Sequence, residues 1–200
     1  MGNVSNKGVI TGTGKVNANI LPDTSGKEIK YTYPTGSNYS DKFSKKTSIV
    51  PSGSQYTLSF YAKSTVSGDK IRAHYYNPNT TTQGVSNQGV TSTASDGNID
   101  FTLSTEWKLY WVTYTQSSTT ATKTIIFPRM FGPDRSEAAK GSGTVSIKML
   151  KFEAGTVPTS WMPCSNDVSY VSESSSLFEG EVDCKILKTG GIKATEFMET

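Results

Sequence analysis

The segment Gln55-Tyr-Thr-Leu-Ser-Phe-Tyr-Ala-Lys63 alternates apolar and polar side chains over nine residues. Successive side chains of a β-strand point to opposite faces, so an alternating segment has one apolar face. Leu58, Phe60 and Ala62 share that face, and we expect them in a core. The opposite face carries Thr57, Ser59, Tyr61 and Lys63. This segment therefore predicts a strand that is buried on one side.

Seven further segments have strand-like composition and are bounded by turn residues such as Pro51-Ser-Gly53. They are Glu28–Tyr33, Phe43–Val50, Lys70–Asn77, Asn98–Leu103, Trp107–Gln116, Lys123–Phe131 and Thr144–Phe152. Short strands at this spacing, with no amphipathic helix between them, predict an all-β antiparallel sandwich or barrel. We expect at most one helical turn, at Ser136–Lys140. Ile125, Ile126 and Phe127 are consecutive, which predicts that both faces of their strand are covered.

The composition excludes several other classes of protein. Serine and threonine occur 27 times each in 200 residues, and charged residues make up 18%, which disfavours helical bundles and coiled coils. The net charge of +3 comes from scattered lysines, so we expect no nucleic-acid binding. No apolar run is long enough to span a membrane, and no secretory signal is visible, so we expect synthesis in a cytoplasm.

Three regions are expected along the chain. Residues 1–26 form a Gly/Asn/Thr-rich N-terminal arm, residues 27–163 a β-domain, and residues 164–200 a polar spacer followed by a short tail. The tail is too small to bury its own core, so we expect it to self-associate. Cys164 and Cys184 lack metal-ligand spacing; we interpret them as free thiols, with a disulfide between them as the alternative.

A group of outward-facing side chains is the candidate binding site. Alternation places Ile71, Ala73, Tyr75, Tyr110, Val112 and Tyr114 in the core. By the same alternation, Tyr61, Arg72, His74, Tyr76 and Trp111 face outward. Exposed aromatic rings mark binding surfaces, and such rings stack on the C–H faces of sugars while Arg and His bond to hydroxyls. These five residues are therefore our candidate glycan site.

Catalytic and metal signals are weak by comparison. His74 is the single histidine, and no nucleophile elbow, zinc-protease or P-loop motif occurs, so we expect no enzyme. Asp134 and Glu137 share a loop, which leaves a polysaccharide-degrading enzyme as a remote alternative. The three residues Asp96, Asn98 and Asp100 resemble the start of a calcium loop but lack its closing glutamate, so we interpret them as a turn and expect no cofactor.

Three segments together carry a family resemblance. They are Ser54–Ser64, Phe101–Thr115 (Phe-Thr-Leu-Ser-Thr-Glu-Trp-Lys-Leu-Tyr-Trp-Val-Thr-Tyr-Thr) and Gly143–Pro163, which ends in Lys151-Phe-Glu-Ala-Gly-Thr-Val-Pro-Thr-Ser-Trp-Met-Pro163. In order and spacing they resemble phage-borne carbohydrate-binding-module-like jelly rolls. Trp107 and Trp161 match family tryptophans that look structural. Lys148-Met149 replaces an acidic pair common in the family, which weakens a calcium or sugar role at that edge.

The resemblance implies a jelly-roll β-sandwich with extended terminal arms, displayed on a virion as a fibre, decoration or tail appendage. Residues 178–197 are similar to short strands of intertwined trimeric phage fibres, which implies a homotrimer. The implied partners are other virion proteins and a host-surface glycan, and the implied location is the particle surface. The alternative is a purely structural decoration or adaptor subunit, whose exposed aromatics contact other virion proteins.

Overall fold

The computed structural model describes residues 17–22, 24, 26–46, 53–76, 82–94, 97–116 and 124–164. These residues belong to the first of two units into which the chain divides, Met1–Val168. The second unit, Ser169–Thr200, lies outside the described residues, as does Cys184. The self-association of the tail and the state of that cysteine therefore stay predictions.

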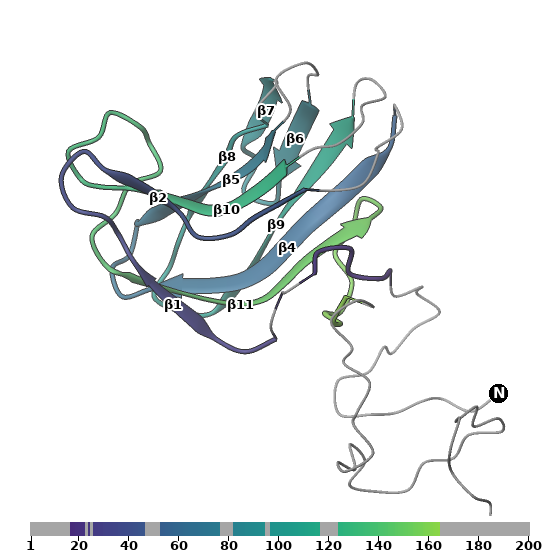
Figure 1. The fold of residues 1–200 in the computed structure, drawn as a ribbon, viewed down its shortest axis with the longest axis horizontal. Coiled ribbons are helices and arrows are strands. Elements are labelled where there is room, and N and C mark those ends of the chain that lie inside the picture. Colours follow the sequence, from purple (N-terminus) through teal and green to yellow (C-terminus); the bar gives the residue numbers. More distant parts are fainter. Residues whose placement is uncertain are drawn as a thin grey trace, which may run out of the picture. The chain divides into compact units, whose positions relative to one another are not determined.

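The strands form two antiparallel sheets, drawn as two layers in Figure 1. The larger sheet has the order β1 (Ile29–Thr32), β11 (Thr144–Ala154), β4 (Gln55–Ser64), β9 (Lys108–Gln116), β6 (Thr82–Ser86) and β7 (Thr91–Ala94). The smaller sheet has the order β2 (Tyr39–Asp41), β10 (Thr124–Phe131), β5 (Lys70–Tyr76) and β8 (Ile99–Thr102), and β3 (Ser44–Lys46) also pairs with β10. The predicted all-β antiparallel sandwich is confirmed.

The core lies between the inner faces of the two sheets. The side chains predicted to face inward on β4, β5 and β9 are all buried: Leu58, Phe60, Ala62, Ile71, Ala73, Tyr75, Tyr110, Val112 and Tyr114. Phe60 sits at the centre, with ring-centroid distances of 4.3 Å to Phe127 and 5.1 Å to Phe101 on the other sheet. Such tilted and edge-on ring pairs add about 0.5–1.5 kcal/mol each beyond their buried area.

Strand β10 contains the three consecutive apolar residues Ile125, Ile126 and Phe127, and its register shifts directly after Ile126. The pairing with β5 shifts between Ile126 and Arg129, around the cis Phe127–Pro128 peptide bond. As a result Phe127 and Met130 are both buried in the core, while Ile126 is half-buried and Arg129 pairs with Arg72 of β5. On the outer face of this strand Ile126 is only half-buried, so that face is covered in part there.

The structure differs from the sequence prediction in two ways. Strands β2, β6 and β7 were not predicted, because their sequences (YSD, TQGVS and TSTA) lack a run of apolar residues. Gly84 of β6 shows why a small residue serves here: a Cβ at this position would lie 3.0 Å from the Tyr114 ring. The predicted helical turn at Ser136–Lys140 is wrong; the segment forms bends, in which Arg135 pairs with Glu137.

Part of the predicted N-terminal arm packs on the sandwich. Leu21 is fully buried in the core, and the Ile20 amide donates to the Phe152 carbonyl of β11 at 2.8 Å. The Asn19 side-chain oxygen accepts from the Leu21 and Phe152 amides at 3.1 Å each. Asn19 also forms an isolated parallel bridge with Cys164, a buried residue. The segment around Leu21 thus completes the sandwich.

Asp69 ties the turn after β4 to the loop before β11. This carboxylate is 4% exposed and accepts hydrogen bonds from the Ser64 hydroxyl and from the Ser142 and Gly143 amides. A Cβ on Gly143 would lie 2.7 Å from an Asp69 oxygen, so glycine is needed there for the close approach.

In the part of the chain that the structure describes, no helix is long and apolar enough to cross a membrane.

Candidate functional site

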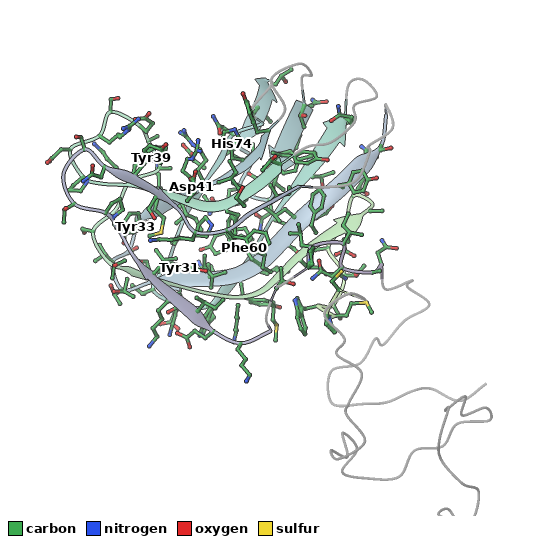
Figure 2. The ribbon with its side chains drawn as sticks, viewed as in Figure 1. Tyr31, Tyr33, Tyr39, Asp41, Phe60 and His74 are labelled. Atoms are coloured by element: carbon green, nitrogen blue, oxygen red, sulfur yellow. The ribbon has the colours of Figure 1, made fainter. Side chains whose placement is uncertain are left out.

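The structure divides the five candidate glycan residues into two groups. Tyr61 (β4) and Trp111 (β9) are on the larger sheet, whereas Arg72, His74 and Tyr76 are on β5 of the smaller sheet. The inner faces of the sheets pack against each other, so the outer faces point in opposite directions. One binding surface cannot include all five residues. Figure 2 labels His74 together with Tyr39 and Asp41 on the smaller sheet, away from the core residue Phe60.

The outer face of the smaller sheet carries a row of charges across four strands. Asp41 of β2 pairs in register with Arg129 of β10, Arg129 with Arg72 of β5, and Arg72 with Asp100 of β8. Both arginines bind their carboxylate through two nitrogens, Arg129 to Asp41 at 2.7 and 2.8 Å and Arg72 to Asp100 at 2.6 and 3.0 Å. We call these four residues the ion-pair row. Two-point Arg–carboxylate bonds hold both groups in fixed orientations.

His74 and Tyr76 lie next to the ion-pair row on β5. A guanidinium nitrogen of Arg129 lies 3.0 Å from Nδ1 of His74. Arginine can only donate, so Nδ1 of His74 is the acceptor in this contact. The His74 ring meets the Tyr76 ring edge-on at 5.3 Å, and Tyr76 is 38% exposed. His74 itself is 7% exposed, so its ring offers little contact surface to a ligand. It instead helps to position Arg129 and Tyr76.

Tyr39 supplies a second exposed ring on this face. Its side chain is 54% exposed, and the guanidinium groups of Arg129 and Arg135 lie 5.4 and 5.3 Å from its ring centre. The buried Phe131 ring underlies Arg72 at 5.1 Å and Arg135 at 5.6 Å. Cation–π contacts of this kind orient the arginines without using their hydrogen-bonding edges. We call Tyr39, Tyr76, His74 and the ion-pair row the tyrosine face.

The charges of this region are compensated in pairs. Arg135 binds Glu137 through two nitrogens at 3.1 and 3.4 Å, as Arg129 binds Asp41 and Arg72 binds Asp100. The hydrogen bond from Arg135 holds the pKa of Glu137 below its usual value. A glycosidase acid needs the opposite shift, because it must keep its proton at neutral pH. The shift at Glu137 is in the opposite direction.

Of the three residues that resemble the start of a calcium loop, Asp100 is engaged in an ion pair. Both oxygens of Asp100 face Arg72, and Asn98 is half-buried beside Gly97, which has a positive φ of 51°. Asp96 lies outside the described residues. Among those that the structure describes, no three His, Cys, Asp or Glu side chains are grouped as a metal site would require.

The outer face of the larger sheet is partly covered by residues 155–161, which we call the strap. Gly155, with a φ of 111°, turns the chain back over the sheet after β11. The Thr57 and Thr113 hydroxyls donate to the Gly155 and Thr156 carbonyls at 2.8 and 3.0 Å. Thr57 and Ser59, expected to face solvent, are consequently buried.

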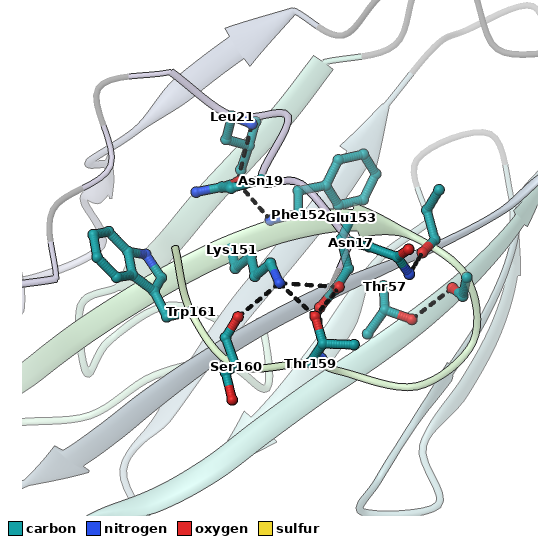
Figure 3. A network of polar contacts seen from close by, with 12 residues as sticks. Asn17, Asn19, Leu21, Thr57, Lys151, Phe152, Glu153, Thr159, Ser160 and Trp161 are labelled. Carbon is teal, nitrogen blue, oxygen red and sulfur yellow. Dashed lines mark hydrogen bonds and ion pairs between the residues drawn. The ribbon is translucent and has the colours of Figure 1, made fainter. Parts of the chain in front are cut away.

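A buried ion pair fixes the strap, as Figure 3 shows. Lys151 and Glu153, both 0% exposed, lie 3.0 Å apart on β11. The Lys151 ammonium also donates to the Thr159 hydroxyl at 2.6 Å and to the Ser160 carbonyl at 2.8 Å. Glu153 accepts from the amide and the hydroxyl of Thr159. The charges of Lys151 and Glu153 are thus satisfied by each other and by Thr159 and Ser160 of the strap.

Between the strap and the sheet lies a groove of about 430 Å³. It is lined by Ser59, Tyr61, Leu109, Met149, Pro158, Thr159, Ser160 and Trp161. Met149 has a φ of 56° at the point where β11 shifts register against β4, between Lys148 and Lys151. Trp111 is half-buried on the same sheet face, and its backbone exchanges two hydrogen bonds with Asn87.

The two family-matched tryptophans have structural contacts. Trp107 precedes β9, and the ammonium groups of Lys63 and Lys148 lie over its ring, 5.1 and 4.3 Å from the ring centre. The Trp161 indole donates to the Leu150 carbonyl at 3.1 Å, and its ring packs so closely on Gly26 that a Cβ there would approach to 3.0 Å. Both tryptophans are half-buried and lie outside the strands, Trp107 at a strand end as expected.

The sequence prediction did not include Tyr39, Asp41 or Arg129 of the tyrosine face. It named Asp100, but not the ion pair that Asp100 forms there. Tyr39 and Asp41 lie on a strand of three residues, which carries too short a pattern to recognise. Arg129 follows the register shift in β10, so simple alternation could not assign its face. A row that joins four strands depends on their pairing, which no local pattern reveals.

No known family profile and no curated protein matches the sequence. Solved structures similar to the chain include the C-terminal domain of EclA, a sugar-binding protein (12% identity, TM-score 0.36, 66% of this chain and 81% of that one). Another is the tripod from the baseplate of bacteriophage Tuc2009 (15%, 0.39, 76% and 60%). A third is the enzymatically active domain of tailspike protein 4 of bacteriophage CBA120 (9%, 0.40, 68% and 21%). The chain spans less than two thirds of each phage chain.

Proposed function

We propose that the chain is a non-catalytic subunit of a phage particle that binds host-surface glycan through the tyrosine face. The observation that carries the proposal is the placement of two exposed rings, Tyr39 and Tyr76, on the same sheet face as the ion-pair row. Rings of this kind stack on the C–H faces of sugars. The row offers guanidinium donors and carboxylate acceptors at fixed positions, as sugar hydroxyls require.

The rigidity of the row favours binding. Arg129 and Arg72 are each held by two bonds to their own carboxylate, and each guanidinium lies beside an aromatic ring, so little side-chain freedom is lost when a ligand arrives. The ion pairs are also only partly covered: the side chains of Arg129 and Asp41 are 19% and 27% exposed. Polar groups at this depth remain within reach of a ligand.

The virion part of the proposal is supported by the ordered motifs of residues 54–163 and by the tail motif. We expect the protein to be made in the host cytoplasm, to assemble as a homotrimer with other virion proteins, and to be displayed on the particle surface. Light scattering on the full chain tests the trimer directly, and a monomeric mass at micromolar concentration would contradict it.

The glycan part is tested by a glycan array followed by titration calorimetry on the glycan that gives a signal. We expect the double variant Tyr39→Ala/Tyr76→Ala to lose at least tenfold in affinity, because it removes both stacking surfaces. The matched control is Val85→Ala, which removes an exposed apolar side chain from the other sheet. An array without signal from folded protein, or equal affinity of the double variant and the wild type, would refute glycan binding at this face.

A further inference from the structure

We propose that the groove under the strap is a second saccharide site, on the opposite side of the sandwich from the tyrosine face. It does not depend on the tyrosine face, since the two surfaces share no residue. Its volume of about 430 Å³ lies within the range of roughly 300–1,000 Å³ usual for small-molecule sites. The occupant to which the lining points is an uncharged sugar of one or a few rings.

The groove is a built site with fixed walls. Trp161 is anchored by the bond from its indole to the Leu150 carbonyl and by its packing on Gly26. The strap residues Thr159 and Ser160 are held by Lys151, which has no exposed surface. A wall fixed in this way need not order itself when the ligand binds, which lowers the entropic cost of binding.

The chemistry of the lining favours a sugar over a charged or purely apolar ligand. Tyr61 and Trp161 contribute aromatic rings, and Leu109 adds an aliphatic surface. Ser59 and Ser160 add hydroxyls, which both donate and accept, as sugar hydroxyls do. This mixture of rings and small hydroxyl groups matches the alternating C–H and O–H surfaces of a pyranose.

The residues that line the groove carry no charge that could pair with an ionic ligand. Lys151 and Glu153, the ion pair beneath the strap, neutralise each other and bind the strap's own atoms. Lys63 and Lys148, two further cations of the larger sheet, lie over the Trp107 ring and do not line the groove. An anionic ligand would thus enter a site without a free counter-charge, at a high desolvation cost.

The test follows the indole N–H signals of the three tryptophans by NMR in the full-length chain. Trp161→Phe assigns the signal of the groove tryptophan. The probes are cellotetraose, maltotetraose and mannotetraose at millimolar concentration, with a galacturonate tetramer as the anionic comparison. We expect at least one neutral tetramer to shift the Trp161 signal saturably, while the Trp107 signal stays in place and the anionic tetramer has no effect.

Two variants locate the binding. Leu109→Arg fills the groove and should weaken the response at least tenfold, whereas Val85→Arg places the same charge on an exposed position of the same sheet and should leave it unchanged. Tyr61→Ala provides a milder second variant in case Leu109→Arg fails to fold. The proposal would be overturned if no neutral tetramer moved the Trp161 signal. It would also be overturned if the signal moved in Leu109→Arg and in Tyr61→Ala as much as in the wild type. Loss of the response in Tyr39→Ala/Tyr76→Ala would also overturn it, because it would assign the binding to the tyrosine face.

Discussion

On the larger sheet, Lys151 and Glu153 form an ion pair with no exposed surface, whereas on the smaller sheet Arg129 and Asp41 form one whose side chains are 19% and 27% exposed. The first pair is enclosed by the strap, and its hydrogen bonds all go to the protein. The second is partly exposed on the outer face of the smaller sheet, beside the exposed Tyr39. The same chemistry thus serves two purposes: under the strap it fixes a chain segment, and on the tyrosine face it presents oriented polar groups to solvent.

The largest effect is expected from breaking the enclosed pair. Lys151→Met should lower the free energy of unfolding by about 3–5 kcal/mol, because Glu153 would remain buried without its counter-charge. Urea denaturation followed by tryptophan fluorescence measures the change. The double variant Lys151→Met/Glu153→Met removes both charges and should recover much of the loss. A single variant within 1 kcal/mol of the wild type would show that the pair does not hold the strap.

A smaller effect is expected from Tyr114, which lies in the interior. An exposed tyrosine would not produce this effect. The Tyr114 hydroxyl is buried without a hydrogen-bond partner in the described structure, and burial, together with the nearby Tyr75, raises its pKa well above the usual 10.0. Above pH 10 the unfolded chain releases this proton while the folded chain keeps it, so stability should fall with rising pH.

Tyr114→Phe should therefore reduce that alkaline loss by up to about 1.4 kcal/mol per pH unit above pH 10. Urea midpoints measured at intervals between pH 7 and 11 give the two curves. Below pH 9 both proteins should show the same slope, which serves as the internal control. Parallel curves above pH 10 would mean that Tyr114 is accessible to solvent in the native state.

The smallest effect on stability is expected from the open pair. Asp41→Asn should change the free energy of unfolding by less than about 1 kcal/mol, because partly exposed ion pairs contribute little. It should nevertheless weaken binding of the glycan identified on the array about tenfold, since Arg129 loses the partner that orients it. A large loss of stability with unchanged affinity would reverse the comparison between the two faces.

The sequence predicted the core well and the surfaces poorly, for a physical reason. Alternation in the segments that form β4, β5 and β9 identifies their buried sides, because burial is decided residue by residue along one strand. The ion-pair row instead depends on the register of four strands, and Arg129 follows a register shift. The division of Tyr61 and Trp111 from Arg72, His74 and Tyr76 depends on which strands share a sheet, which alternation does not encode.

The covered face illustrates a second limit of sequence patterns. Ser59 and Thr57 are polar and alternate with apolar residues, so they were expected to face solvent, and only the return of the chain at Gly155 buries them. Lys151 and Glu153 would likewise be assigned to a surface by composition. Their burial follows from Thr159 and Ser160, which reach them from six to nine residues further along the chain.

The parallel bridge between Asn19 and Cys164 suggests how the domain would respond to tension on its two ends. Because the two segments run in the same direction, tension applied to the chain before Asn19 and after Cys164 slides them along each other instead of peeling them apart. We expect sliding to load together the two hydrogen bonds that join this segment to β11, from the Phe152 amide to the Asn19 side chain and from the Ile20 amide to the Phe152 carbonyl, and to pull on the buried Leu21. We therefore expect the bridge and these bonds to resist such pulling together.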